Sequence, residues 1–176
     1  MNRSLSCPAP KFDLSSLLRG RPQASAVLTG SGDHPALSGV VRFYQTGAGV
    51  VVWAEFSGLP VAPPPCGGRI FGFHIHAGGD CAGSPDDPFS AALGHYDPGG
   101  CPHPYHAGDL PPLFESGGIA LCVFLTDRFS VSEVVGRTVI LHDHPDDLTT
   151  QPSGGSGKRI ACGVIRKNCV LARSAP

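Results

Sequence analysis

The chain has 176 residues, of which 24 are glycine and 18 are proline, and only 15% are charged. So many helix-interrupting residues disfavour long helices and coiled coils, whereas 41% apolar content is too high for a disordered chain. The formal net charge of −1 gives no electrostatic reason to expect nucleic acid or an anionic membrane as a partner, and no apolar run approaches the roughly 18 residues of a membrane span. The composition favours one domain of short strands joined by many turns.

The first part of the chain changes character at residue 24. Residues 1–23 are interrupted by prolines and predict an N-terminal extension with one short helical turn at 14–18. This extension lacks the continuous apolar core of a signal peptide, so we expect a cytoplasmic protein. Three strands rich in β-branched or aromatic residues follow, separated by glycine-containing turns: 26–28, 40–44 and 50–56.

The second part combines strands with two long loops. Residues 69–76 alternate well enough for a strand, but 77–116 show almost no periodicity, which is unusual in a compact domain unless the loop is functional. A second loop at 145–157 is rich in glycine, serine and proline. Further strands are predicted at 117–127, 138–142 and 159–170.

The chain contains no internal repeat and no linker that suggests a second domain. We therefore predict one all-β domain over residues 24–170, a sandwich or barrel with two long loops. A C-terminal tail at 171–176 would follow it.

Seven of the eight histidines lie between positions 74 and 144. His74 and His76 form a His-x-His pair on a predicted strand, where the period of two places both imidazoles on one face, close enough to share a metal. His142 ends a later strand. The long loop between them adds three imidazoles and one carboxylate, which is a closed tetrahedral set for zinc: His95, His103, His106 and Asp109.

Other interpretations of these residues are weaker. A lone histidine is most often a surface or core residue, and this is how we interpret His34 and His144. The joint pattern of the remaining six histidines favours metal binding. Signatures of competing chemistry are missing: the sequence has no glycine-rich phosphate loop ending in Lys-Ser/Thr, no Gly-x-Ser-x-Gly turn and no Cys-x-x-Cys pair. Nothing favours a Ser-His-Asp or Cys-His catalytic set.

Five motifs in order resemble copper/zinc superoxide dismutase, and the resemblance runs from about residue 24 to 165. Two features resemble the bacterial branch of this family: the short interval between His76 and Cys81, and the segment Leu-Pro-Pro-Leu-Phe at 110–114. The motifs are Gly-Phe-His-Ile-His at 72–76 with Gly-Asp-Cys at 79–81, Gly-His-Tyr-Asp-Pro at 94–98, His-Ala-Gly-Asp-Leu at 106–110, Gly-Arg-Thr-Val-Ile-Leu-His at 136–142 with Asp-Asp-Leu at 146–148, and Gly-Lys-Arg-Ile-Ala-Cys-Gly-Val-Ile at 157–165.

The resemblance implies a Greek-key β-barrel or flattened sandwich with one copper and one zinc. Asp146 would link a copper histidine to a zinc histidine, Arg159 would attract the anionic substrate, and Cys81 would form a disulfide with Cys162. The implied copper ligands are His74, His76, His95 and His142, and the implied zinc ligands are His95, His103, His106 and Asp109. His95 would therefore be a bridging imidazolate, which two flanking cations make reasonable near neutral pH.

The implied reaction is the disproportionation of superoxide to O₂ and hydrogen peroxide. Copper would be reduced by one superoxide and reoxidised by a second, and His95 would take up and return a proton during the cycle. The expected partner is superoxide, without nucleic acid or membrane, and a homodimer is left open. Two alternatives on the same fold are a copper-binding or copper-delivery module, against which the complete ligand set argues, and a structural zinc domain.

Several features depart from the family pattern. Only two residues separate His103 from His106, and the loop at 143–158 contains three aspartates but one lysine, so a strong attractive field for the substrate is not evident. Cys66 and Cys101 lack partners in the family pattern, and a second disulfide between them is left open. Cys122, in a predicted strand, is most simply a buried free thiol.

Overall fold

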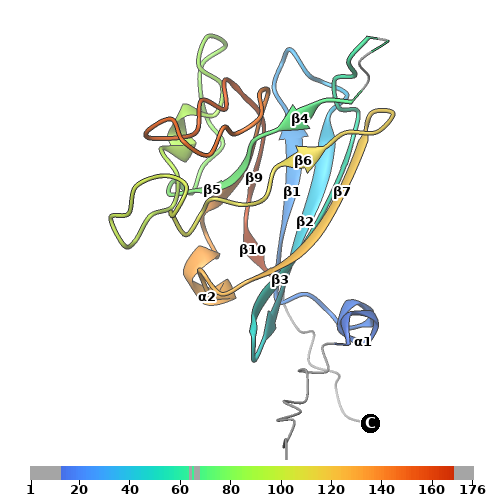
Figure 1. The fold of residues 1–176 in the computed structure, drawn as a ribbon, viewed down its shortest axis with the longest axis vertical. Helices are drawn as coiled ribbons and strands as arrows, with labels where there is room; N and C mark the ends of the chain where they lie inside the picture. Colours follow the sequence, from blue (N-terminus) through green and yellow to red (C-terminus); the bar gives the residue numbers. More distant parts are fainter. Residues whose placement is uncertain (1–12, 64, 66–67, 169–176) are drawn as a thin grey trace, which may run out of the picture.

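The computed structural model describes residues 13–63, 65 and 68–168, and most of its strands form one curled antiparallel sheet (Figure 1). Along this sheet the strand order is β5-β8-β9-β1-β2-β3-β7, β10 pairs with β1, and β4 and β6 form a separate two-stranded ladder. The strands are β1 (Ala24–Gly30), β2 (Ser38–Thr46), β3 (Gly49–Ser57), β4 (Ile70–Phe71), β5 (Phe73–His76), β6 (Leu113–Phe114), β7 (Ile119–Thr126), β8 (Thr138–His142), β9 (Arg159–Val164) and β10 (Arg166–Lys167). The short helices are α1 (Leu14–Arg19), α2 (Val131–Val134) and the 3-10 helix η1 (Ser90–Ala92).

The first three strands form the meander that their composition predicted. β2 pairs with β3 from Ser38 opposite Ser57 to Thr46 opposite Gly49. Gly49 has a φ of 129°, and a Cβ built on it would lie 2.3 Å from a backbone oxygen of β7, so this turn requires glycine. Inward-facing side chains of the sheet fill the core, where the Phe56 ring meets Phe73 edge to face at 5.9 Å.

The β4–β6 ladder joins the two edges of the curled sheet. β4 leads into the edge strand β5 through Gly72, and β6 leads into the edge strand β7 through a turn in which Ser116 pairs with Ile119. Ile70 pairs with Phe114 in the ladder itself. This arrangement confirms the predicted all-β barrel of the copper/zinc superoxide dismutase type.

Two long loops leave the barrel and lie on the same side of the molecule (Figure 1). Gln151 of the second loop connects them, because its Oε1 accepts a hydrogen bond from the backbone N–H of His103 at 3.0 Å and its Nε2 donates to the His103 carbonyl at 2.7 Å. Gly72 allows the second loop to lie against the barrel, since a Cβ at this position would come within 2.7 Å of Ser156 Oγ. The two loops therefore form one layer over the strands that carry histidine.

Some elements differ from the sequence-based expectations in their extent. The strand predicted at 69–76 is divided at Gly72, and the one predicted at 159–170 is divided at Ile165. The helix α2 was not predicted; Ser130 and Glu133 form a capping box at its start, in which each side chain bonds to the other residue's backbone. The predicted helical turn is confirmed as α1. Residues 1–12 of the extension, residues 169 and 170 of the last strand, and the tail at 171–176 lie outside the described residues.

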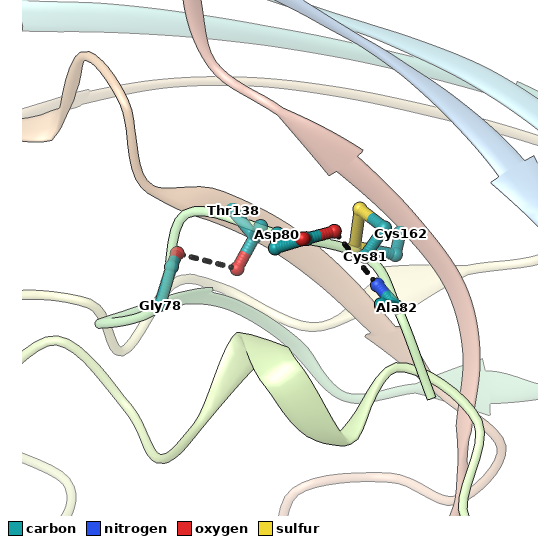
Figure 2. The surroundings of a disulfide bond; sticks show 6 residues. All are labelled: Gly78, Asp80, Cys81, Ala82, Thr138 and Cys162. Carbon is teal, nitrogen blue, oxygen red and sulfur yellow. Dashed lines mark hydrogen bonds between the residues drawn. A yellow bond between two sulfur atoms is a disulfide. The ribbon is translucent and has the colours of Figure 1, made fainter. Parts of the chain in front are cut away.

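A disulfide between Cys81 and Cys162 attaches the first loop to β9, as the resemblance implied, and its Cα atoms are 5.8 Å apart. Figure 2 shows a further attachment of this loop, in which Thr138 Oγ1 of β8 donates to the carbonyl of Gly78 at 3.1 Å. Within the loop, Asp80 Oδ1 accepts a hydrogen bond from the backbone N–H of Ala82 at 2.9 Å. The start of the first loop is therefore fixed to β8 and β9.

Replacing Cys162 with serine should lower the free energy of unfolding by up to about 4 kcal/mol, because the disulfide closes a loop of 81 residues in the unfolded chain. Urea unfolding of the metal-free oxidised protein measures this loss. Cys122→Ser is the matched control, since Cys122 is half-buried and bonds to no described cysteine. Equal stability of Cys162→Ser and Cys122→Ser, or peptide mapping that pairs Cys81 with another cysteine, would contradict the prediction.

Candidate metal centre

Three of the predicted ligand histidines come from neighbouring strands. His74 and His76 lie on β5, and His142 lies at the end of β8, which pairs with β5 in antiparallel register. All three side chains are buried. The Nε2 atoms of His76 and His142 are 3.3 Å apart. Two ring nitrogens converge in this way when they are directed at a common point.

The first long loop brings a second group of ligand-type residues against the first. His95 belongs to both groups: one is His74, His76, His95 and His142, and the other is His95, His103, His106 and Asp109. Within each group the ligand atoms all lie within 4.8 Å of one another. The structure thus brings together all seven predicted ligand residues, with one imidazole shared.

Four buried imidazole nitrogens in these groups have no hydrogen-bond partner among the described residues: His74 Nδ1, His95 Nε2, His103 Nδ1 and His106 Nδ1. A buried polar atom without a partner costs about 1–3 kcal/mol, so four of them in one place indicate that something else satisfies them. His103 Nδ1 and His106 Nδ1 also lie 3.1 and 3.2 Å from the same oxygen, Asp109 Oδ2. These donors fit metal cations, which bind neutral imidazole nitrogens and carboxylate oxygens.

In three of the ligand histidines, the second ring nitrogen is hydrogen-bonded to another group of the protein. Asp146 is buried between the two groups, with Oδ2 at 2.7 Å from His74 Nε2 and Oδ1 at 2.9 Å from His103 Nε2. His76 Nδ1 donates to the carbonyl of Leu93 at 2.7 Å. Such partners orient a ligating imidazole and select the nitrogen that is free to bind. Asp146 therefore lies where the resemblance implied, in contact with one histidine of each group.

Burial controls the charge of the strand histidines. It lowers the pKa of His76 to about 2, of His142 to about 3 and of His74 to about 4, and repulsion between the imidazoles adds to the effect. These rings are therefore neutral at neutral pH, as metal ligands must be. Burial acts to raise the pKa of Asp146, but hydrogen bonds from His74, the Leu148 backbone and His103 outweigh it and hold this pKa well below its usual range.

We expect the metal-free protein to lose stability as the pH falls from about 6.5 to about 4. The unfolded chain takes up protons on these histidines near their ordinary pKa of 6.5, whereas folded His74, His76 and His142 stay neutral down to about 4 or lower. Protons therefore bind preferentially to the unfolded state, at a cost of about 1.4 kcal/mol per histidine for each pH unit. Urea unfolding of the chelated protein across this range measures the effect, and a pH-independent midpoint would contradict it.

A cavity of about 810 Å³ opens onto the histidines, and its lining includes His76, His95, His142 and Arg159. Arg159 starts β9 and is held in place, because Nη2 donates to the Leu93 carbonyl at 3.1 Å and Nη1 lies 3.3 Å from Asp87 Oδ1. Acidic residues outnumber basic ones along the cavity: Asp86, Asp87, Asp97 and Asp143 against Lys158 and Arg159. The structure therefore places Arg159 beside the histidines in an otherwise acidic opening.

The other described histidines and cysteines lie outside the two groups. His34 Nδ1 is 3.1 Å from Ser31 Oγ, and His144 is an exposed residue at the mouth of the cavity, paired with its neighbour Asp143. Cys101 is exposed and bonds to no described cysteine, while Cys66 lies outside the described residues. Cys122 is half-buried, and this burial raises the pKa of its thiol.

Sequence reasoning missed three residues that support the site. Gln151 joins the two loops at His103, Asp87 pairs with Arg159, and Arg128 donates to carbonyl oxygens of the first loop. None of them belongs to a motif with a recognisable spacing, because each acts through a contact between segments that are distant in sequence.

Comparison with known proteins agrees with this geometry. The family described as copper/zinc superoxide dismutase matches residues 37–165. The chain is 36% identical over 144 residues to a Cu-Zn superoxide dismutase of Legionella pneumophila, covering 77% of this chain and 82% of that protein. It is 37% identical over 142 residues to the Cu-Zn superoxide dismutase of Photobacterium leiognathi, covering 73% of this chain and 78% of that protein. It is 34% identical over 148 residues to the Cu-Zn superoxide dismutase of Deinococcus radiodurans, covering 74% of this chain and 78% of that protein.

All three relatives are bacterial, in agreement with the bacterial branch that the motifs indicated. None of the described helices has the length and apolar character needed to cross a membrane. The family match covers most of the chain, and the histidine groups fit two metals. The chain therefore belongs to the copper/zinc superoxide dismutase family: it is a superoxide dismutase, with copper and zinc as cofactors and superoxide as substrate.

Proposed function

We propose that each histidine group serves one metal and that His95 serves both. Copper would be held by His74, His76, His95 and His142, since four imidazoles suit a metal that changes between two oxidation states. Zinc would be held by His95, His103, His106 and Asp109, a closed set of the kind that supplies structure. The observation that carries the assignment is the shared His95, which belongs to two complete groups of donors.

Bound copper supplies one-electron chemistry, by which one superoxide is oxidised to O₂ and a second is reduced to hydrogen peroxide. The second half of this reaction needs protons, and His95 would deliver one. Its Nε2 is buried without a partner, and the residue lines the cavity. Its Nδ1 is 2.7 Å from Asp109 Oδ1, so the ring is held from the zinc side. Because His95 lines the cavity through which superoxide would enter, a proton carried on its ring would lie close to the substrate.

Arg159 would attract superoxide. The substrate is a small monoanion with few features to recognise, so its negative charge is the main property by which a protein can attract it. The guanidinium lines the same cavity as His76 and His142, and Leu93 and Asp87 fix its position. A charge in a recessed site raises encounter rates about 10- to 10³-fold.

Asp146 would set the orientation of one ligand in each metal group. Its two oxygens receive the Nε2–H groups of His74 and His103, which leaves the Nδ1 atom of each ring free for a metal. Gly154 makes room for it, because a Cβ on Gly154 would lie 2.0 Å from Asp146 Oδ1. We propose that this carboxylate couples the geometry of the copper group to that of the zinc group.

Metal analysis combined with turnover tests the assignment. We expect one copper and one zinc per chain in the loaded protein, and superoxide turnover that depends on added copper. Copper uptake without turnover would indicate the copper-delivery module instead. Zinc binding without copper uptake would indicate the structural zinc domain. Neither alternative is favoured by the complete set of ligands.

The cytoplasmic location stays a prediction, and the homodimer stays open. The Cys81–Cys162 disulfide is typical of an oxidising compartment, so it argues against the cytoplasm. Fractionation of the source cells would decide the location, and sedimentation of the loaded protein would decide the assembly.

A further inference from the structure

Arg128 contacts the backbone of the loop segment that carries the proposed zinc ligands. Its Nη1 donates to the carbonyl oxygens of Pro104, His106 and Asp109, at 3.1, 3.3 and 3.2 Å. The guanidinium thus gathers three carbonyls from residues 104–109 around one nitrogen. Two of these carbonyls belong to residues of the zinc group.

The segment that carries Arg128 is itself fixed. The backbone N–H of Arg128 donates to Thr126 Oγ1 at 3.3 Å, just after β7 ends. The next residue, Phe129, is buried and meets Phe43 of β2 edge to face at 6.4 Å. The guanidinium therefore reaches the loop from a packed part of the barrel.

The other hydrogen bonds from outside this segment hold its two ends, while the bond from the His106 backbone N–H to Asp109 Oδ2, at 3.0 Å, is internal to it. Gln151 bonds to the backbone of His103 at the beginning, and Gly108 donates to the Tyr96 carbonyl at 2.8 Å near the end. Among the residues that the structure describes, no other side chain hydrogen-bonds to the carbonyls of Pro104 or His106. Among the described residues, Arg128 is thus the side chain from outside the segment that hydrogen-bonds to its middle.

We propose that Arg128 is a positioning residue for the zinc group. By holding the backbone at Pro104, His106 and Asp109, it keeps His106 Nδ1 within 3.2 Å of Asp109 Oδ2 and so gathers these two donors before a metal arrives. Without such support, the short segment would have to be ordered by the metal itself, and part of the binding free energy would be lost to that ordering. The inference rests on the proposed assignment of this group to zinc.

The test compares the zinc affinity of metal-free variants by competition with a chelator, and the absorption spectrum of cobalt(II) bound in place of zinc. Arg128→Gln should weaken zinc binding about 10- to 100-fold, the usual effect of losing a group that orients metal ligands, and should alter the cobalt spectrum. Copper affinity should fall much less than zinc affinity, because three of the four copper ligands lie on strands that Arg128 does not contact and only His95 is shared. Arg128→Lys should restore most of the zinc affinity, since an ammonium has three N–H donors for three carbonyls.

Two further variants make the outcome decisive. Arg42→Gln is the matched control, because Arg42 stacks on Trp53 and pairs with Glu55 on the sheet, and it should change neither metal affinity. Asp109→Ala tests the zinc assignment itself, which fails if that variant still binds zinc normally. If Asp109→Ala loses zinc but Arg128→Gln binds it like the wild type, the positioning role is wrong. Equal loss of copper and zinc in Arg128→Gln would also overturn it, since that result indicates general loosening.

Discussion

His142→Ala should abolish superoxide turnover while zinc stays bound. His142 belongs only to the proposed copper group, and its Nε2 lies 3.3 Å from that of His76, so its removal takes one of the converging donors from copper. His142 contributes no ligand atom to the proposed zinc group. Metal content by mass spectrometry and turnover at full metal supply measure the two effects. Loss of zinc with copper retained would reverse the assignment of the two groups.

His106→Ala is the reciprocal variant and should lose zinc first. His106 belongs only to the proposed zinc group, and its buried Nδ1 has no hydrogen-bond partner in the part of the chain that the structure describes. His34→Ala serves as the control, since His34 contacts Ser31 and belongs to neither group. Normal metal content and turnover in the control would show that the losses in the other variants are specific to the two groups.

Changing the charge of Arg159 should change the rate of superoxide turnover without changing metal content. Arg159 lines the cavity but belongs to neither metal group. Superoxide dismutases are a standard example of diffusion-limited enzymes, so attraction of the substrate is expected to show directly in the rate. Arg159→Lys should keep most of the activity, Arg159→Ser should lose much of it, and Arg159→Glu should lose more, within the range of about 10- to 10³-fold for such attraction.

The aspartates around the cavity should make the wild-type rate only weakly dependent on salt. Four aspartates and two basic residues line the opening, so attraction and repulsion are both screened beyond about 10 Å at 0.1 M salt. Asp87→Asn should raise the rate at low salt, because it removes a carboxylate 3.3 Å from the guanidinium of Arg159. Turnover measured across ionic strength at fixed metal content tests both statements. If Arg159→Glu is as fast as the wild type at low salt, Arg159 has no role in guiding the substrate.

The strands were the part of the fold most open to prediction from sequence. The strands β1 to β3 are rich in β-branched and aromatic residues between glycine turns, and the structure places them close to the predicted positions. The division at Gly72 was not predictable, because it depends on Ser156 of a distant loop, whose Oγ would lie 2.7 Å from any Cβ there. The helix α2 is only four residues long, too short for helical periodicity to reveal.

The candidate site was predictable to the extent that its residues form motifs. His74 and His76 share a strand, and the order of the other motifs led to the seven ligand-type residues and to Asp146, which the structure brings together. The Cys81–Cys162 disulfide followed from the resemblance and is confirmed. Asp87, Gln151 and Arg128 could not be found in this way, because single polar residues in loops have no pattern of their own.

By itself, the sequence determined the chemical types of the donors and the all-β class, because ligand chemistry and strand alternation are local properties of the chain, and its motifs implied the type of barrel through their resemblance to a family. Only the tertiary structure decided how the donors are held. The fold places one carboxylate between two histidines, a guanidinium against three carbonyls of the first loop, and four aspartates around the cavity that Arg159 lines. These contacts join segments far apart in the chain, and they depend on how the two loops pack over the barrel, which no local pattern encodes.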